Sequence, residues 1–121
     1  MKAGNQKAGV RLRLVLGPHV AIGPGKADLL DAVARTGSIA AGGRELGMSY
    51  KRAWLLVDSM NRCFAEPLVT SSRGGNTRGG AQLTPTGERV LASFRRAQAL
   101  AEEALIEELA ELRGLANLSE H

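Results

Sequence analysis

The sequence predicts a mainly α-helical fold with small β-hairpins. Apolar residues make up 44% of the 121 residues but aromatic residues only 3%, so the core must consist of Leu, Val, Ile and Ala, which favours helices over a large sheet. Capped segments with helical periodicity recur along the chain, and short alternating segments stand beside Gly- and Pro-containing turns. The length suffices for one small domain.

The chain opens with a polar segment, residues 1–9, that we expect to be a flexible terminus. Arg11–Leu16 alternates with a period of two and predicts a strand, and Val20–Ile22 is its return strand after a turn at 17–19. We expect one leucine face of this hairpin to pack on the helices. The two arginines of the first strand would then point into solvent or toward a phosphate, and solvation is the simpler interpretation.

A first helix is predicted to begin near Pro24 and end near Arg35, because proline suits a first helical turn. Gly37 can end it as a left-handed cap. Its apolar face consists of Leu29, Leu30 and Val33.

A second, short helix is predicted from the capping Ser38 to about Leu46. Its side chains are small at 40–43, where two consecutive glycines each cost roughly 1 kcal/mol relative to alanine. We interpret this composition as room for another helix to approach closely.

The third helix is predicted from the capping Ser49 to about Phe64, and Pro67 prevents its continuation. Apolar residues recur at intervals of four, three and four and form one buried stripe: Ala53, Val57, Met60 and Phe64. The first turn, with Tyr50, Lys51 and Arg52, is therefore free to face outward.

Two short strands, Leu68–Thr70 and Ala81–Leu83, flank a Gly- and Arg-rich loop at Arg73–Gly80, which we interpret as a wing. Thr84 and Pro85 then begin a long helix that is expected to reach Leu112. Such a helix, about 44 Å long, overhangs so small a domain and needs a partner, most simply a second copy. The predicted dimer interface is its apolar seam, chiefly Leu91, Phe94, Ala101, Leu105, Leu109 and Leu112.

The predicted organisation is therefore a flexible N-terminus (1–9), a winged helix-turn-helix domain (10–83), a dimerisation helix (84–113) and a tail (114–121). A short helix, a glycine turn and a capped helix form the arrangement that presents base-reading residues in a helix-turn-helix.

The charge distribution agrees with a polyanionic partner. The net charge is +4, but fifteen of the sixteen basic residues and only six of the twelve acidic residues lie in 1–100, a balance of +9. Residues 101–121 carry a balance of −5. A basic body with an acidic end suits binding to nucleic acid.

The candidate DNA-binding residues come from three segments. The third helix contributes the main set, in which Trp54 either packs within the domain or contacts the DNA backbone. Ser38 is first a helix cap, and Arg44 follows it on the second helix. The full set is Ser38, Arg44, Ser49, Tyr50, Lys51, Arg52, Trp54, Arg73, Gly74, Thr77 and Arg78.

Other function classes find little support. No Ser/His/Asp or Cys/His grouping and no phosphate-binding glycine motif occurs, so we expect no enzyme, cofactor or metal site. The single cysteine, Cys63, falls on an apolar helix face and reads as an inert thiol. The longest uncharged run, Leu14–Gly25, is too short to span a bilayer, and no signal peptide opens the chain, so a cytoplasmic protein is expected.

Several uncommon strings occur in order along the chain: Ala34–Ile39, Leu46–Trp54, Met60-Asn61, Leu68-Val69, the Gly-rich loop and Gly80–Gly87. Together they resemble the DNA-binding half of the ModE-type molybdate-responsive regulators, over roughly residues 10–105. It implies a winged helix-turn-helix of the LysR-like kind, a homodimer formed through the long helix, and a palindromic operator.

The chain also departs from that family. Members that sense molybdate carry carboxy-terminal oxyanion-binding modules, for which 121 residues leave no room, so we do not expect molybdate binding. The leading hypothesis is a dimeric winged helix-turn-helix transcription regulator that binds DNA sequence-specifically, a stand-alone variant governing molybdenum-related or other metabolic genes. Two alternatives stay open: an oxyanion sensor that binds molybdate at the dimer interface, and a dimeric protein-interaction adaptor that does not bind DNA.

Overall fold

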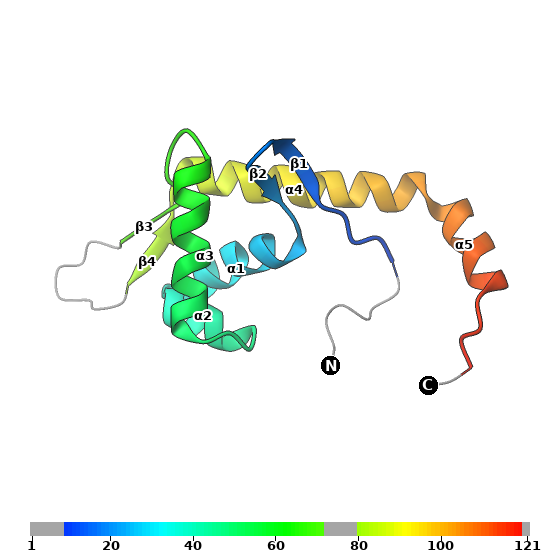
Figure 1. Cartoon of the computed structure of the whole chain (residues 1–121), viewed down its shortest axis with the longest axis horizontal. Helices are drawn as coiled ribbons and strands as arrows, with labels where there is room; N and C mark the ends of the chain where they lie inside the picture. Colours follow the sequence, from blue (N-terminus) through cyan, green and yellow to red (C-terminus); the bar gives the residue numbers. More distant parts are fainter. Residues whose placement is uncertain (1–8, 72–79, 120–121) are drawn as a thin grey trace.

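The computed structural model describes residues 9–71 and 80–119, which form a small helical body on one long helix (Figure 1). The mainly helical fold with two hairpins is confirmed. In chain order the elements are β1 (Leu14–Gly17), β2 (Val20–Ile22), α1 (Pro24–Thr36), α2 (Ile39–Glu45), α3 (Tyr50–Cys63), β3 (Val69–Ser71), β4 (Ala81–Leu83), α4 (Pro85–Ala104) and α5 (Ile106–Leu115).

The core lies where α1, α3, the second hairpin and α4 meet. Its largest fully buried side chains come from the three helices and from the residue just before β3: Leu29, Leu30, Val33, Met60, Leu68 and Phe94. Few aromatic residues contribute, as the composition predicts. The body is therefore held by aliphatic packing around α1, whose buried face is the predicted one.

Local capping residues set the ends of the helices as expected. Gly37 adopts a left-handed conformation (φ 75°), and its N–H donates to the carbonyl of Val33 at 2.8 Å. Thr84 begins α4: its hydroxyl oxygen accepts from the N–H of Gly87 at 2.9 Å and its O–H donates to the carbonyl of Pro67 at 2.7 Å. The first turn of α4 is thus fixed to the chain that precedes the second hairpin.

The two glycines of α2 allow α1 and α3 to approach it closely. A methyl group on Gly42 would lie 3.1 Å from the backbone nitrogen of Val33 in α1. One on Gly43 would lie 2.6 Å from the Cβ of Ala53 in α3. The predicted close approach is confirmed, and it involves both neighbouring helices at once.

The first strand is shorter than predicted. We expected a strand over Arg11–Leu16, but β1 begins at Leu14 and includes Gly17. The three-residue β2 pairs only with Leu14, Val15 and Gly17, so residues 11–13 have no strand to bond to. Strand length is set here by the partner and not by the alternating pattern.

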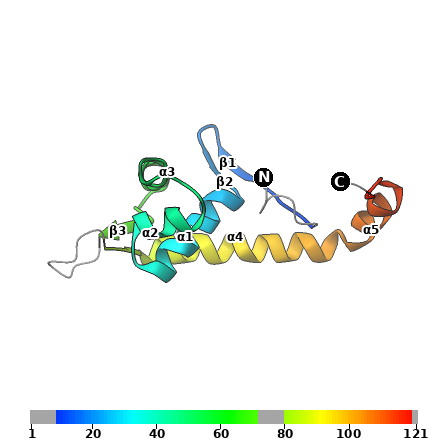
Figure 2. The same ribbon diagram turned by 90° about the horizontal axis from the view of Figure 1, so that it is seen from below.

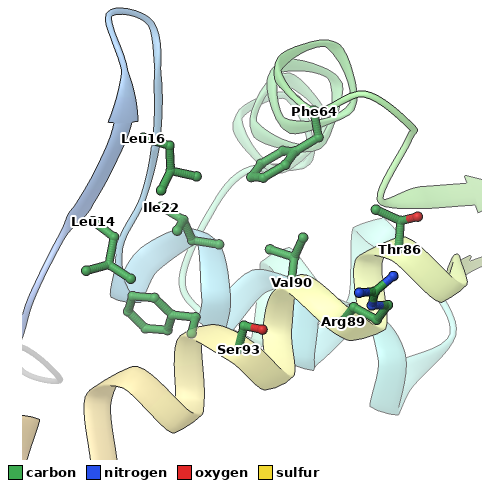
Figure 3. Close-up of a pocket in the computed structure, with 9 residues that line it drawn as sticks. Leu14, Leu16, Ile22, Phe64, Thr86, Arg89, Val90 and Ser93 are labelled. Atoms are coloured by element: carbon green, nitrogen blue, oxygen red, sulfur yellow. The ribbon is translucent and has the colours of Figure 1, made fainter. Parts of the chain in front are cut away.

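The β1–β2 hairpin packs against the helical body along only part of its length. Between it, the end of α3 and α4 lies an open apolar groove of about 320 Å³, across which Leu16 and Ile22 face Phe64 and Val90 (Figure 3). Leu12 and Leu14 pack against the core, whereas Leu16 remains 59% exposed. The predicted leucine face thus packs except at the residue next to the turn.

The predicted single helix to Leu112 is wrong, because α4 ends at Ala104 and α5 begins at Ile106. Figure 2 shows α4 running past the body before the bend. In the described chain no residue after Phe94 is fully buried, so packing does not hold the helix straight. Glutamates on both sides of Leu105 (102, 103, 107 and 108) repel one another, which disfavours a continuous helix.

Two residues of the predicted dimer seam, Leu91 and Phe94, are used within the single chain. Phe94 is 1% exposed and belongs to the core of the single chain, and Leu91 packs against that core. Ala101 is half-buried, while Leu105 sits at the helix break. The chain's own body thus covers the seam at Leu91 and Phe94, whereas Leu105 and Leu112 are 38% and 61% exposed, and their part in a dimer contact stays a prediction. Leu109 and Leu112 follow on α5, which has no buried residue.

Replacing Gly43 with alanine should destabilise the protein by about 1–3 kcal/mol, because the added methyl group would clash with Ala53 between α2 and α3. Urea unfolding followed by circular dichroism measures this. Gly25→Ala is the matched control, because nothing lies within 4 Å of the added methyl group there. A Gly43→Ala protein as stable as the wild type would contradict the packing argument.

Candidate nucleic-acid interface

The first turn of α3 projects from the body while the rest of the helix is anchored. The Ser49 hydroxyl oxygen accepts from the N–H of Arg52 at 3.1 Å, which confirms the predicted cap. Tyr50 is 58% exposed, and Lys51 and Arg52 are exposed beside it. The buried stripe Ala53, Val57 and Met60 holds the opposite face of the helix in the core.

The turn between α2 and α3 fixes the angle at which that first turn is presented. Gly47 adopts a left-handed conformation (φ 76°), where L side chains are strained. The N–H of Met48 donates back to the carbonyl of Gly43 at 2.8 Å, so the chain reverses within four residues. The helix-turn-helix geometry predicted from the glycine turn is present.

A pair of oppositely charged residues braces α1 against α2. The guanidinium of Arg35 donates to both carboxylate oxygens of Glu45, at 2.9 and 3.1 Å, and to Asp31 at 3.0 Å. The hydrogen bonds from Arg35 lower the pKa of Glu45, and those from Glu45 and Asp31 raise the pKa of Arg35. The brace therefore stabilises the fold at pH values above the ordinary carboxyl pKa. This stabilisation is lost as the pH falls through the lowered pKa of Glu45. Both groups are solvated, so its contribution is modest.

The two α2 candidates differ in their surroundings. Ser38 is half-buried, and its hydroxyl oxygen accepts from the N–H of Ala41 at 3.0 Å, so the cap interpretation is confirmed. Arg44 is exposed and has no side-chain partner among the described residues. It is free to contact a phosphate, which stays a prediction.

The base of the second hairpin is fastened to the helix-turn-helix. The N–H of Ala81 donates to the carbonyl of Gly37 at 2.9 Å, and Ser38 pairs with Gly80 as an isolated bridge. The predicted wing contacts themselves lie outside the described residues: Arg73, Gly74, Thr77 and Arg78. The structure thus describes where the wing starts, close to α2 and α3.

Asn61 is a site-building residue that the sequence analysis did not single out. From α3 its side-chain oxygen accepts from the N–H groups of Leu68 and Val69, at 2.8 and 3.1 Å. Its amide nitrogen donates to the carbonyl of Val69 at 3.0 Å. All three bonds tie α3 to the start of β3. Its signals in the sequence are its place in the Met60-Asn61 string of the family resemblance and a polar amide next to the buried stripe.

Trp54 is 45% exposed and borders a cavity of about 160 Å³ between α3 and the second hairpin. The sequence left two possibilities for it, packing or DNA contact. In the structure its ring lines this cavity and is also partly exposed to solvent. It stands on the same helix as the Ser49–Arg52 turn, one turn farther along.

Other groups do not form a reactive centre in the described part of the chain. Cys63 is half-buried, with its thiol 3.5 Å from the carbonyl oxygen of His19. No group of three His, Cys, Asp or Glu side chains within 9–71 and 80–119 could hold a metal ion. Over the same residues, no helix has the length and apolar character needed to cross a bilayer.

Comparison with known proteins identifies similar sequences over this region. The model of the bacterial regulatory helix-turn-helix proteins of the lysR family matches residues 26–88. The molybdenum-pterin-binding protein MopB of Rhodobacter capsulatus is 49% identical over 73 residues, 60% of this chain and 27% of that protein. The DNA-binding transcriptional dual regulator ModE of Escherichia coli K12 is 36% identical over 85 residues, 70% of this chain and 32% of that protein. The chain thus spans about a quarter to a third of these relatives' length.

A solved structure has the same fold. The crystal structure of a CbnR_DBD–DNA complex superimposes with a TM-score of 0.57 at 23% identity, covering 72% of this chain and 94% of that chain. The expected winged helix-turn-helix fold is confirmed. The matching family consists of regulatory proteins, in agreement with the expectation that the chain is not an enzyme.

Asn61→Ala should lower the free energy of unfolding by about 1–3 kcal/mol, because it leaves the N–H groups of Leu68 and Val69 without their acceptor. Urea unfolding measures this. Arg62→Ala on the next residue is the control: it removes only an exposed pair with Asp58 and should change stability by less than about 1 kcal/mol. Equal effects of the two changes would argue against a special role for Asn61.

Proposed function

The chain belongs to the LysR family of bacterial regulatory helix-turn-helix proteins, and we propose that it is a transcriptional regulator that binds duplex DNA sequence-specifically. The observation that carries this proposal is the capped start of α3. There, exposed Tyr50, Lys51 and Arg52 project from a helix whose other face is buried. A helix presented in this way can enter the major groove, where lysine and arginine donate to guanine.

We further propose that the regulated genes are linked to molybdenum. The support is the similarity to proteins named molybdenum-pterin-binding protein and ModE. Since the chain corresponds to only part of those proteins, this link rests on the portion that it shares with them. A regulator of this kind acts in the cytoplasm, where bacterial DNA lies.

The proposed regulator is a homodimer, because a palindromic operator needs two recognition helices about one turn of DNA apart, roughly 34 Å. The buried face of α4 is used by the body, so we place the dimer contact on its exposed face. This strip comprises Arg89, Ala92, Ser93, Arg96, Ala99, Leu100 and Glu103, all exposed and all within about a third of the helix circumference.

The charges on that strip are complementary to themselves in an antiparallel pair. Arg96 and Glu103 lie two turns apart, and neither forms an ion pair within the described chain. If the two-fold axis passes near Ala99 and Leu100, Arg96 of each copy faces Glu103 of the other. The small Ala92, Ser93 and Ala99 side chains allow the helices to approach.

Salt should weaken DNA binding steeply. If each protomer neutralises about four phosphates, a plot of log K against log salt concentration has a slope near −7. Fluorescence anisotropy with labelled duplexes at several salt concentrations measures the slope. An affinity independent of salt would contradict a DNA-binding regulator and favour the interaction adaptor.

Lys51→Ala should reduce discrimination between operator and random duplexes by about 1–3 kcal/mol, because a base contact is lost. Arg78→Ala in the predicted wing should instead weaken binding to every duplex. Operator fragments selected from genomic DNA supply the specific target. Arg113→Ala on α5 is the control, because it also removes one positive charge but lies far from α3. It should leave the discrimination between operator and random duplexes unchanged.

Arg96→Glu and Glu103→Arg should each weaken the dimer, because each places like charges opposite one another across the antiparallel contact. The double exchange should restore dimerisation. Sedimentation equilibrium of the four proteins measures the dissociation constants. Dimerisation unchanged by all three variants would place the contact elsewhere on the surface.

A further inference from the structure

We propose that the cavity between α3 and the second hairpin binds one phosphodiester of the DNA backbone through three uncharged donors. These are the indole N–H of Trp54 and the hydroxyl groups of Thr70 and Ser71. The inference rests on the proposed function, and it adds a contact to the sugar-phosphate strand that runs along one side of the recognition helix.

The cavity is lined by residues of α3 and of the β3–β4 hairpin. Figure 1 shows these two elements beside each other. Its volume of about 160 Å³ is roughly five times the ~30 Å³ that a water molecule occupies in the liquid, which is room for one phosphodiester. Its lining includes apolar residues that are buried or half-buried, among them Ile39, Val57 and Val69. Trp54, Thr70 and Ser71 also line it and are exposed.

The indole N–H and the two hydroxyl groups form no hydrogen bond with another described residue. The other polar groups of the cavity are already engaged. Asn61 bonds to the backbone of Leu68 and Val69, and the carboxylate of Asp58 is paired with Arg62 at 3.1 Å. That pairing offsets the one negative charge that would oppose a phosphate.

The dimensions of DNA explain why a phosphate should reach this cavity. An α-helix with its side chains is about 10–12 Å wide and fills a major groove that is about 12 Å across. Residues that flank the helix therefore meet the two sugar-phosphate strands that border the groove. The flank of α3 next to the second hairpin carries the cavity, with hydroxyl and indole donors of the kind that contact phosphate oxygens.

Uncharged contacts have a signature that distinguishes them from lysine or arginine contacts. They displace no counterions, so their loss lowers affinity without changing the salt slope. They also read no base, so the loss is the same for operator and random duplexes. A hydrogen bond to a charged acceptor corresponds to about a tenfold or greater change in affinity.

The test uses the full chain with Thr70→Ala/Ser71→Ala, and with Trp54→Phe, which keeps an aromatic ring but removes the N–H. We expect each variant to bind operator and random duplexes about tenfold or more weakly, with an unchanged salt slope. Ser119→Ala, beyond α5, is the control and should bind like the wild type. Urea unfolding of each variant verifies that the fold is intact.

Two further readouts locate the contact. Trp54 is the single tryptophan of the chain, so its fluorescence should change on addition of DNA to the wild type. Ethylation of one operator phosphate should weaken the wild type but cause no additional loss in Thr70→Ala/Ser71→Ala. If the wild type binds DNA and the variants bind it equally well, the phosphate site is wrong but the proposed function stands. The same conclusion follows if the variants show a smaller salt slope. A wild type that binds no duplex would overturn the proposed function together with the phosphate site.

Discussion

The contact of α2 with both of its neighbours is the constraint on which the rest of the structure depends. At Gly42 and Gly43 this short helix carries no side chain. A methyl group would be tightly confined against α1 at Gly42 and would clash with Ala53 of α3 at Gly43. The distance between α2 and α3 is therefore set by backbone and small-atom contact, which varies far less than contact between long side chains. The direction in which the first turn of α3 leaves the body follows from this packing.

The candidate DNA-binding surface is formed by elements whose other faces belong to the core. One face of α3 is buried through Val57 and Met60, and the same helix exposes Lys51 at its start. Asn61 fastens α3 to β3, and the bond from Ala81 to Gly37 fastens β4 to the end of α1. A helix and a hairpin joined in this way move together, so binding to DNA need not order them at an entropic cost.

The long helix α4 has different tasks on its two sides. Phe94 completes the core, and Arg95 pairs with Asp28 of α1 at 3.0 Å. The exposed side carries small side chains between Arg96 and Glu103. If the exposed side joins two copies, one helix connects the core of each protomer directly to the dimer contact, and the spacing of the recognition helices then depends on how α4 is held.

The sequence by itself determined the features that depend on a few neighbouring residues. Caps and turns at Gly37, Ser38, Ser49 and Thr84 are as predicted, because each is satisfied within one helical turn. Tertiary structure decided what depends on distant partners: the length of β1, the partner of Phe94, the bonds of Asn61 and the end of α4 at Ala104. Hydrophobic periodicity predicts only that one face of a helix will be buried. Which element buries that face depends on packing between segments far apart in the chain, and local propensities do not encode such packing.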